Sequence, residues 1–137
     1  HDWSPTSLTV PPPFTTFAGL YERFDARAGD PEFTLPTRWI EARTLFGPGG
    51  RFATVPFNLV ASADIIGGNS GSPLVNRQGE VVGLIFDGNL ASLVGDVVYD
   101  PATNRAIAVD SRAILAALEH VYDAKELVAE IAASGDR

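Results

Sequence analysis

Short runs of apolar and β-branched residues, each bounded by turn-forming residues, dominate the middle of the chain. Such runs predict strands, because branched side chains fit a half-buried pleated surface and Gly, Pro, Asn and Asp favour the turns between them. The six runs are Thr37 to Phe46, Phe52 to Ser62, Ser72 to Asn76, Glu80 to Phe86, Gly95 to Tyr99 and Arg105 to Val109. Six short strands at close spacing predict a small antiparallel barrel or sandwich over residues 36–110.

The first 35 residues are predicted to form an N-terminal arm. Three consecutive prolines at positions 11–13 fix the backbone angle φ and remove amide donors, so this stretch is expected to run extended over the surface. A short helix is predicted inside the arm, where Phe17, Leu20, Tyr21 and Phe24 recur at helical spacing. We interpret these aromatic side chains as part of a packed core rather than as a ligand site.

The last part of the chain, residues 111–137, changes to a helical period. An amphipathic helix is predicted from the apolar side chains of Ile114, Leu115, Leu118, Val121 and Tyr122. Asp110 or Ser111 is expected to cap it. Asp123 and Glu126 resemble a capping box that opens a second helix, which Gly135 would end. The sequence therefore predicts a β region followed by C-terminal helices.

Composition and charge narrow the classes of function. The chain has 137 residues, of which 45% are hydrophobic, and this is enough for one domain with its own core. It has no Cys, which excludes thiol catalysis and disulfides, and its formal net charge of -7 argues against nucleic acid and anionic membrane surfaces as partners. No apolar run approaches the roughly 18 to 20 residues of a membrane span, so no membrane insertion is expected.

The segment from Asp64 to Asn76, DIIGGNSGSPLVN, is the part of the sequence that most needs a chemical explanation. In acyl transfer a serine hydroxyl must lie beside two amide N–H groups that face the developing oxyanion, and each such donor contributes roughly 10²- to 10³-fold in rate. Here Ser70 is the candidate nucleophile, and the amides of Gly68 and Ser70 are the candidate oxyanion hole. The alternative is a polar turn between two strands, a common place for Gly, Asn and Ser.

The residues after Ser70 favour the catalytic interpretation. Ser72-Pro73 leads into a strand, a turn and a second apolar run, and a Gly-x-Ser-Gly-x-Pro turn followed by such a hairpin resembles trypsin-like serine peptidases. The combination of GGNSGSPLVN with GEVVGLIFDGN is more specific. Together with PFTTFAGLYER and FTLPTRW upstream, it resembles the C-terminal end of the bacterial family that includes dipeptidyl peptidases 7 and 11, from about Pro13 to about Ile131.

This resemblance implies a Ser-His-Asp exopeptidase that releases dipeptides from the free N-terminus of a peptide. The implied fold is mainly β: the chain would form the C-terminal β-barrel half of a chymotrypsin-like double barrel, with C-terminal α-helices. Ser70 would be acylated, Gly68 and Ser70 would form the oxyanion hole, and Asp87 would pair with the α-ammonium of the substrate. Gly88 matches the position that controls the pocket for the second residue of the substrate, P1. An Arg there would select acidic side chains, whereas Gly implies a hydrophobic or broad preference.

Two residues near this position qualify the resemblance. Asp87-Gly88 between apolar runs is also a common hairpin-turn signature, and both interpretations of Asp87 stay open. Leu90 departs from the aromatic residue expected after FDGN in the family, so the resemblance does not predict the shape of the pocket wall.

The general base that Ser70 would need is not evident in the sequence. The chain has two histidines: His1 lies at the terminus and His120 on the predicted tail helix, where a solvated surface role is expected. In the family, the base and its Asp lie far upstream of the serine. The chain is therefore expected to be a C-terminal fragment, inactive alone, that associates with the remainder of its own enzyme or as a homodimer. The family further implies a periplasmic or cell-surface location in a bacterium.

Two other functions remain compatible with the sequence. The chain could belong to another trypsin-like peptidase, such as an endopeptidase, or be a non-catalytic β-barrel binding module in which Ser70 is a turn residue. No metal and no cofactor are expected, because the acidic residues are scattered and nucleotide-binding fingerprints are absent.

Overall fold

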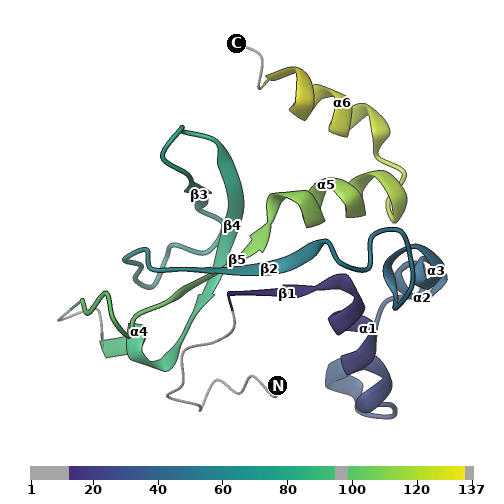
Figure 1. Cartoon of the computed structure of the whole chain (residues 1–137), viewed down its shortest axis with the longest axis horizontal. Coiled ribbons are helices and arrows are strands. Elements are labelled where there is room, and N and C mark those ends of the chain that lie inside the picture. The colour runs from purple at the N-terminus through teal and green to yellow at the C-terminus, as the bar shows by residue number, and fades with distance from the viewer. Residues whose placement is uncertain (1–12, 95–98, 135–137) are drawn as a thin grey trace. The chain divides into compact units, whose positions relative to one another are not determined.

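The computed structural model describes residues 13–94 and 99–134, which divide into two compact units. One unit combines the start of the chain, up to Thr15, with Asn58–Ser111, and the other combines Thr16–Phe57 with the residues from Arg112 onward. The first unit carries most of a five-stranded sheet (Figure 1). It also contains the segment from Asp64 to Asn76 with Ser70, here called the serine segment. The second unit is mostly helical. We describe each unit by itself.

The five strands form one sheet in the order β1-β2-β5-β4-β3. Their bounds are β1 Phe14–Thr16, β2 Pro56–Ala61, β3 Pro73–Val75, β4 Val81–Gly88 and β5 Ala106–Asp110. The β2–β5, β5–β4 and β4–β3 pairs are antiparallel. Among the described residues β1 and β3 are edges, so the sheet is not closed. The predicted antiparallel sheet with helices is confirmed at this level, whereas a barrel is not.

The central strand β5 is buried on both faces. Ala106 and Ala108 are fully buried, and Ile107 is nearly so. Gly83 of β4 lies opposite the end of this strand, and a Cβ on it would stand 2.6 Å from the carbonyl oxygen of Val109. The close approach of the two backbones therefore requires glycine at position 83.

An aromatic cluster forms the core of the helical unit. Phe17, Tyr21 and Phe46 are completely buried. The centroid of the Phe17 ring lies 4.6 Å from that of Phe46 and 5.2 Å from that of Phe57. The Tyr21 hydroxyl donates a hydrogen bond of 2.6 Å to the carbonyl of Trp39, and burial raises the Tyr21 pKa. The predicted packing role of these aromatic residues is thus what the structure shows.

The helix α1, Phe17–Ala26, confirms the short helix expected in the N-terminal arm. The hydroxyl of Thr16 caps it by accepting a hydrogen bond of 3.2 Å from the amide of Gly19. Strand β1, directly before it, was not predicted from the sequence, and the prolines at positions 11 and 12 lie outside the described residues.

The strand predicted for Thr37 to Phe46 is wrong. This segment forms two short helices, α2 Thr37–Glu41 and α3 Arg43–Phe46. In a strand, Thr44 would share a face with Ala42 and Phe46, whereas the helical spacing buries Ala42 and Phe46 in the aromatic cluster and leaves Thr44 exposed. A single 3₁₀ turn, Pro31–Phe33, and helix α4, Leu90–Val94, were not predicted either. Of the strand expected at Gly95 to Tyr99, residues 95–98 lie outside the described part.

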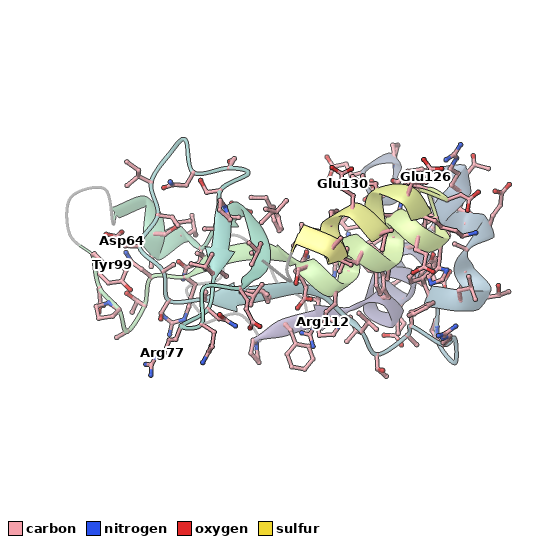
Figure 2. All side chains as sticks on the ribbon, turned by 90° about the horizontal axis from the view of Figure 1, so that it is seen from above. Asp64, Arg77, Tyr99, Arg112, Glu126 and Glu130 are labelled. Carbon is pink, nitrogen blue, oxygen red and sulfur yellow. The ribbon has the colours of Figure 1, made fainter. Side chains whose placement is uncertain are left out.

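The remaining strand predictions hold with shifted ends. Phe52 to Ser62 contains β2 but begins with a turn. The runs Ser72 to Asn76, Glu80 to Phe86 and Arg105 to Val109 differ from β3, β4 and β5 by one or two residues at their ends. Both predicted tail helices are present, as α5 Ser111–His120 and α6 Lys125–Ser134. Glu126 and Glu130 lie exposed on α6 (Figure 2).

The capping box expected before α6 is not formed as predicted. Asp123 has a positive φ of 53°, whereas a capping residue adopts an extended conformation. Its carboxylate instead lies 3.0 Å from the ammonium group of Lys125 and raises the pKa of that lysine. Within the described residues, no helix is both long enough and apolar enough to cross a bilayer.

Replacing Phe17 with Ala should destabilise the protein by about 3–5 kcal/mol, because it empties the centre of the aromatic cluster. Phe14→Ala is the matched control. Phe14 is 51% exposed, and its replacement should cost less than about 1 kcal/mol. Urea unfolding followed by tryptophan fluorescence measures both changes. Equal losses in the two variants would contradict the assignment of the core.

Candidate functional site

The serine segment folds into two consecutive turns that share Asn69. The first turn is closed by the amide of Asn69, which donates to the carbonyl of Ile66 at 3.2 Å. The second is closed by the amide of Ser72, which donates to the carbonyl of Asn69 at 2.9 Å. Each turn has a glycine with positive φ as its third residue: Gly68 at 99° and Gly71 at 86°. Turns of this kind need a residue that tolerates positive φ there, which explains the Gly-Asn-Ser-Gly order.

The side chain of Asn69 and the backbone of β4 hold these turns in place. The Asn69 side-chain oxygen accepts a hydrogen bond of 2.8 Å from the amide of Ile66, across the first turn. The amide of Gly71 donates to the carbonyl of Ile85 at 2.7 Å, and the amide of Ile85 donates to the carbonyl of Ser72 at 3.0 Å. The serine segment is thus attached to β4 by two backbone hydrogen bonds directly after Ser70.

Ser70 lies at the exposed second position of the second turn. Within residues 13–94 and 99–134, neither the amide of Ser70 nor that of Gly68 donates a hydrogen bond to another group of the protein. A Cβ at Gly68 would meet nothing within 4 Å, so glycine is required there by the backbone angle of 99° and not by lack of space. An exposed hydroxyl and amides without an internal acceptor are two of the features that an acyl-transfer site requires.

All four residues singled out in the sequence line one pocket of about 260 Å³. They are Gly68, Ser70, Asp87 and Gly88, and its walls also include Ile65, Ile66, Gly67, Asn69, Ile85, Phe86 and Ser92. Among these described lining residues, Asp87 alone carries a charge. The pocket therefore combines an apolar wall, a serine and one carboxylate, as a site for a cationic group attached to an apolar one requires.

Asp87 and Gly88 belong to the end of strand β4 and not to a hairpin turn. Asp87 pairs with Ile107 and Gly88 with Ala106 of β5, and neither has a positive φ. The turn alternative for these two residues is therefore wrong. Phe86 is skipped in the pairing register, which makes it a β-bulge. Bulges redirect side chains at the ends of strands and often border functional sites.

The carboxylate of Asp87 is exposed. One of its oxygens accepts a hydrogen bond of 2.8 Å from the amide of Gly88, which fixes the orientation of the group. Among the described residues, no group donates a hydrogen bond to the other oxygen, which is able to accept one from a ligand.

Asn89, which follows Gly88, is a buried residue whose role the sequence did not reveal. It is 7% exposed, and its side-chain amide donates to the carbonyl of Thr103 at 2.7 Å. Its side-chain oxygen accepts from the amides of Arg105 at 3.0 Å and Ser92 at 3.2 Å. Asn89 thereby joins the end of β4 to the segment that enters β5. Its signal in the sequence is the Asn that directly follows Asp87-Gly88 in GEVVGLIFDGN.

The segment that Asn89 contacts, which begins at Asp100-Pro101, is itself a turn. The Asp100 carboxylate accepts hydrogen bonds from the amide of Ala102 at 2.9 Å and the hydroxyl of Thr103 at 2.8 Å, and these bonds lower its pKa. Tyr99, labelled in Figure 2, donates its hydroxyl hydrogen to the carbonyl of Ser62, on the stretch that leads to the serine segment.

His120 is not among the described residues that line the pocket. His120 is the last residue of α5, in the helical unit, where its ring lies 4.7 Å from that of Phe52 and its Nε2 3.7 Å from the carboxylate of Glu119. His1, the other histidine of the sequence, lies outside the described residues. Among the described residues, no group of three or more His, Asp or Glu side chains could hold a metal ion.

Comparisons with known proteins agree with one another. A family model described as Peptidase S46 matches residues 1–133. The chain is 37% identical over 121 residues to the dipeptidyl-peptidase 7 of Capnocytophaga gingivalis, a match over 86% of this chain and 17% of the relative. It is 42% identical over 80 residues to the Asp/Glu-specific dipeptidyl-peptidase of Shewanella putrefaciens, over 58% of this chain and 11% of the relative.

A solved structure matches as well. The crystal structure of Porphyromonas endodontalis DPP11 in complex with the dipeptide Arg-Asp has a TM-score of 0.74 and 28% sequence identity, over 94% of this chain and 19% of that chain. The chain thus spans less than a fifth of the length of the relatives it matches.

Replacing Asn89 with Ala should lower the free energy of unfolding by more than about 2 kcal/mol, because buried donors and acceptors lose their partners. Asn76→Ala is the matched control: its side chain also makes three hydrogen bonds, but these are exposed. Thermal unfolding of both variants measures the difference. A larger loss for Asn76→Ala would contradict the role assigned to Asn89.

Proposed function

Because this chain belongs to the peptidase S46 family, we propose that it carries the nucleophile and substrate-anchoring half of a serine-type dipeptidyl peptidase. Such an enzyme releases dipeptides from the free N-terminus of a peptide. The observation that carries the proposal is the single pocket that brings Ser70, Gly68, Asp87 and Gly88 together. The names of the matched relatives and the dipeptide bound to a matched structure support it.

In the proposed reaction the Ser70 oxygen attacks the carbonyl carbon of the second peptide bond, and its proton passes to a general base. The negative charge that develops on the carbonyl oxygen is stabilised by the amides of Gly68 and Ser70, which lack recorded internal acceptors. The intermediate collapses to an acyl-enzyme as the rest of the peptide leaves with a proton. Water then attacks the ester, releases the dipeptide and restores the hydroxyl.

Asp87 is proposed to bind the α-ammonium group of the substrate. It is the only charged residue among the described residues of the pocket, and one oxygen of its carboxylate is oriented by the amide of Gly88. A charge-assisted bond between the α-ammonium and Asp87, in the pocket that also contains Ser70, would set the cut after two residues. Gly88 leaves the adjoining wall without a side chain, which favours an apolar or broad P1 preference.

The general base and its carboxylate partner are proposed to lie on residues outside this chain, since the relatives are several times longer. The five-stranded antiparallel sheet is likewise proposed to be part of a chymotrypsin-like barrel. The periplasm or cell surface of a bacterium is the location that the family implies for such an enzyme.

Ser70→Ala should abolish covalent labelling by a fluorophosphonate in the whole enzyme that carries this chain, because the reagent reacts with an activated serine. Ser62→Ala, an exposed serine outside the pocket, should label like the unmodified enzyme. Mass spectrometry locates the adduct. Absence of labelling in the unmodified enzyme, or an adduct on another residue, would refute the assignment of Ser70.

Asp87→Asn should lower kcat/KM for peptides with a free N-terminus by at least about tenfold, mainly through KM, because the ion pair with the α-ammonium is lost. Asp64→Asn is the control, because Asp64 is an exposed carboxylate on the segment that contains Ser70 and does not line the pocket. Liquid chromatography of the released dipeptides gives the rates. Efficient cleavage of N-terminally blocked peptides would instead favour an endopeptidase.

A further inference from the structure

The space beside Gly88 is already occupied. A Cβ built on Gly88 would stand 2.3 Å from the hydroxyl oxygen of Ser92, 3.3 Å from the Ser92 Cβ and 3.2 Å from Cδ1 of Ile65. Gly88 does not have a positive φ, so the backbone would accept another residue. What keeps position 88 free of a side chain is therefore its neighbour, chiefly the hydroxyl group of Ser92.

Ser92 is held firmly in this position. It is 8% exposed and lies on α4, and its hydroxyl donates a hydrogen bond of 2.6 Å to the carbonyl of Asn89. Its amide donates to the carbonyl of Asn89 at 2.9 Å and to the Asn89 side-chain oxygen at 3.2 Å. To clear the space beside Gly88, the hydroxyl would have to rotate and break its bond to a buried carbonyl, which is unfavourable.

Resting on the proposed function, we propose that Ser92 is a second specificity-determining residue of the pocket, one that dictates the absence of a side chain at position 88. Ser92 lines the same pocket as Ser70 and Asp87. Its hydroxyl fills the volume from which a side chain at position 88 would start toward the substrate. The neutral, open character of the P1 wall then depends on two residues, Gly88 and Ser92, and not on Gly88 alone.

This pairing has a consequence for selectivity toward acidic substrates. An Arg at position 88 would supply a cation for a P1 carboxylate, but its Cβ meets Ser92 before its guanidinium can reach the pocket. Ser92→Ala removes the overlapping oxygen and leaves a Cβ at 3.3 Å. It also leaves no orphaned acceptor, because the carbonyl of Asn89 keeps the bond from the amide of residue 92. Both changes are therefore needed together.

The test compares Gly88→Arg with the double variant Gly88→Arg/Ser92→Ala in the whole enzyme. Dipeptidyl fluorogenic substrates with Leu, Asp or Glu at P1 report kcat/KM. We expect the double variant to cleave the acidic substrates about tenfold better than Gly88→Arg does, as coupled neighbours in contact commonly show. Gly88→Arg/Ser62→Ala, with the exposed serine replaced, should behave like Gly88→Arg. Equal activity of all three variants on the acidic substrates would overturn the role of Ser92.

A second readout separates this inference from the proposed function. Thermal unfolding should show that Gly88→Ala lowers Tm and that adding Ser92→Ala recovers part of the loss, whatever reaction the enzyme catalyses. Simply additive losses in Tm would overturn the steric pairing. An unmodified enzyme that releases no dipeptides, with the recovery of Tm intact, would instead refute the dipeptidyl-peptidase proposal and leave the pairing of Gly88 and Ser92 standing.

Discussion

The position of Ser70 depends on two glycines whose backbone angles few other residues adopt. Gly68 and Gly71 each provide the positive φ that closes one of the two linked turns, and Asn69 belongs to both. An alanine at either glycine would be strained even where space is open. The position of the hydroxyl is thus set by the backbone of its neighbours, and among the described residues no hydrogen bond from the Ser70 side chain holds the segment.

The second requirement is that this segment and the end of β4 stay in register. The paired bonds between Gly71, Ser72 and Ile85 join two stretches that lie more than ten residues apart in sequence. Four residues beyond Ile85, the buried Asn89 fixes the end of the strand to the entry of β5. Between these two anchor points stand Phe86, Asp87 and Gly88, held at both ends. Strand geometry with a bulge therefore places these three pocket residues, a more rigid support than a free loop would be.

Sequence reasoning found the pocket residues but misjudged part of their setting. The glycines around Ser70 and the strands β3, β4 and β5 carry local signals, namely positive-φ positions and β-branched runs, and these were sufficient. The segment 37–46 misled because Thr, Trp, Ile and Phe favour strands, whereas burial of Ala42 and Phe46 with an exposed Thr44 between them requires a helix. That burial is a tertiary effect. The roles of Asn89 and Ser92 were also not predicted, since they depend on burial and on hydrogen bonds that only the folded structure shows.

The selectivity of the pocket must come from local groups and not from the charge of the whole chain. A formal net charge of -7 attracts cationic peptides in general, but salt screens such attraction beyond about 8 Å under physiological conditions. Any positive group on a peptide, at either end or in a side chain, feels the same field. Asp87 differs because its carboxylate is oriented by a neighbouring amide and shares a pocket with Ser70. In the proposed reaction, a free N-terminus would therefore be distinguished from other cations by its distance to the bond that Ser70 attacks.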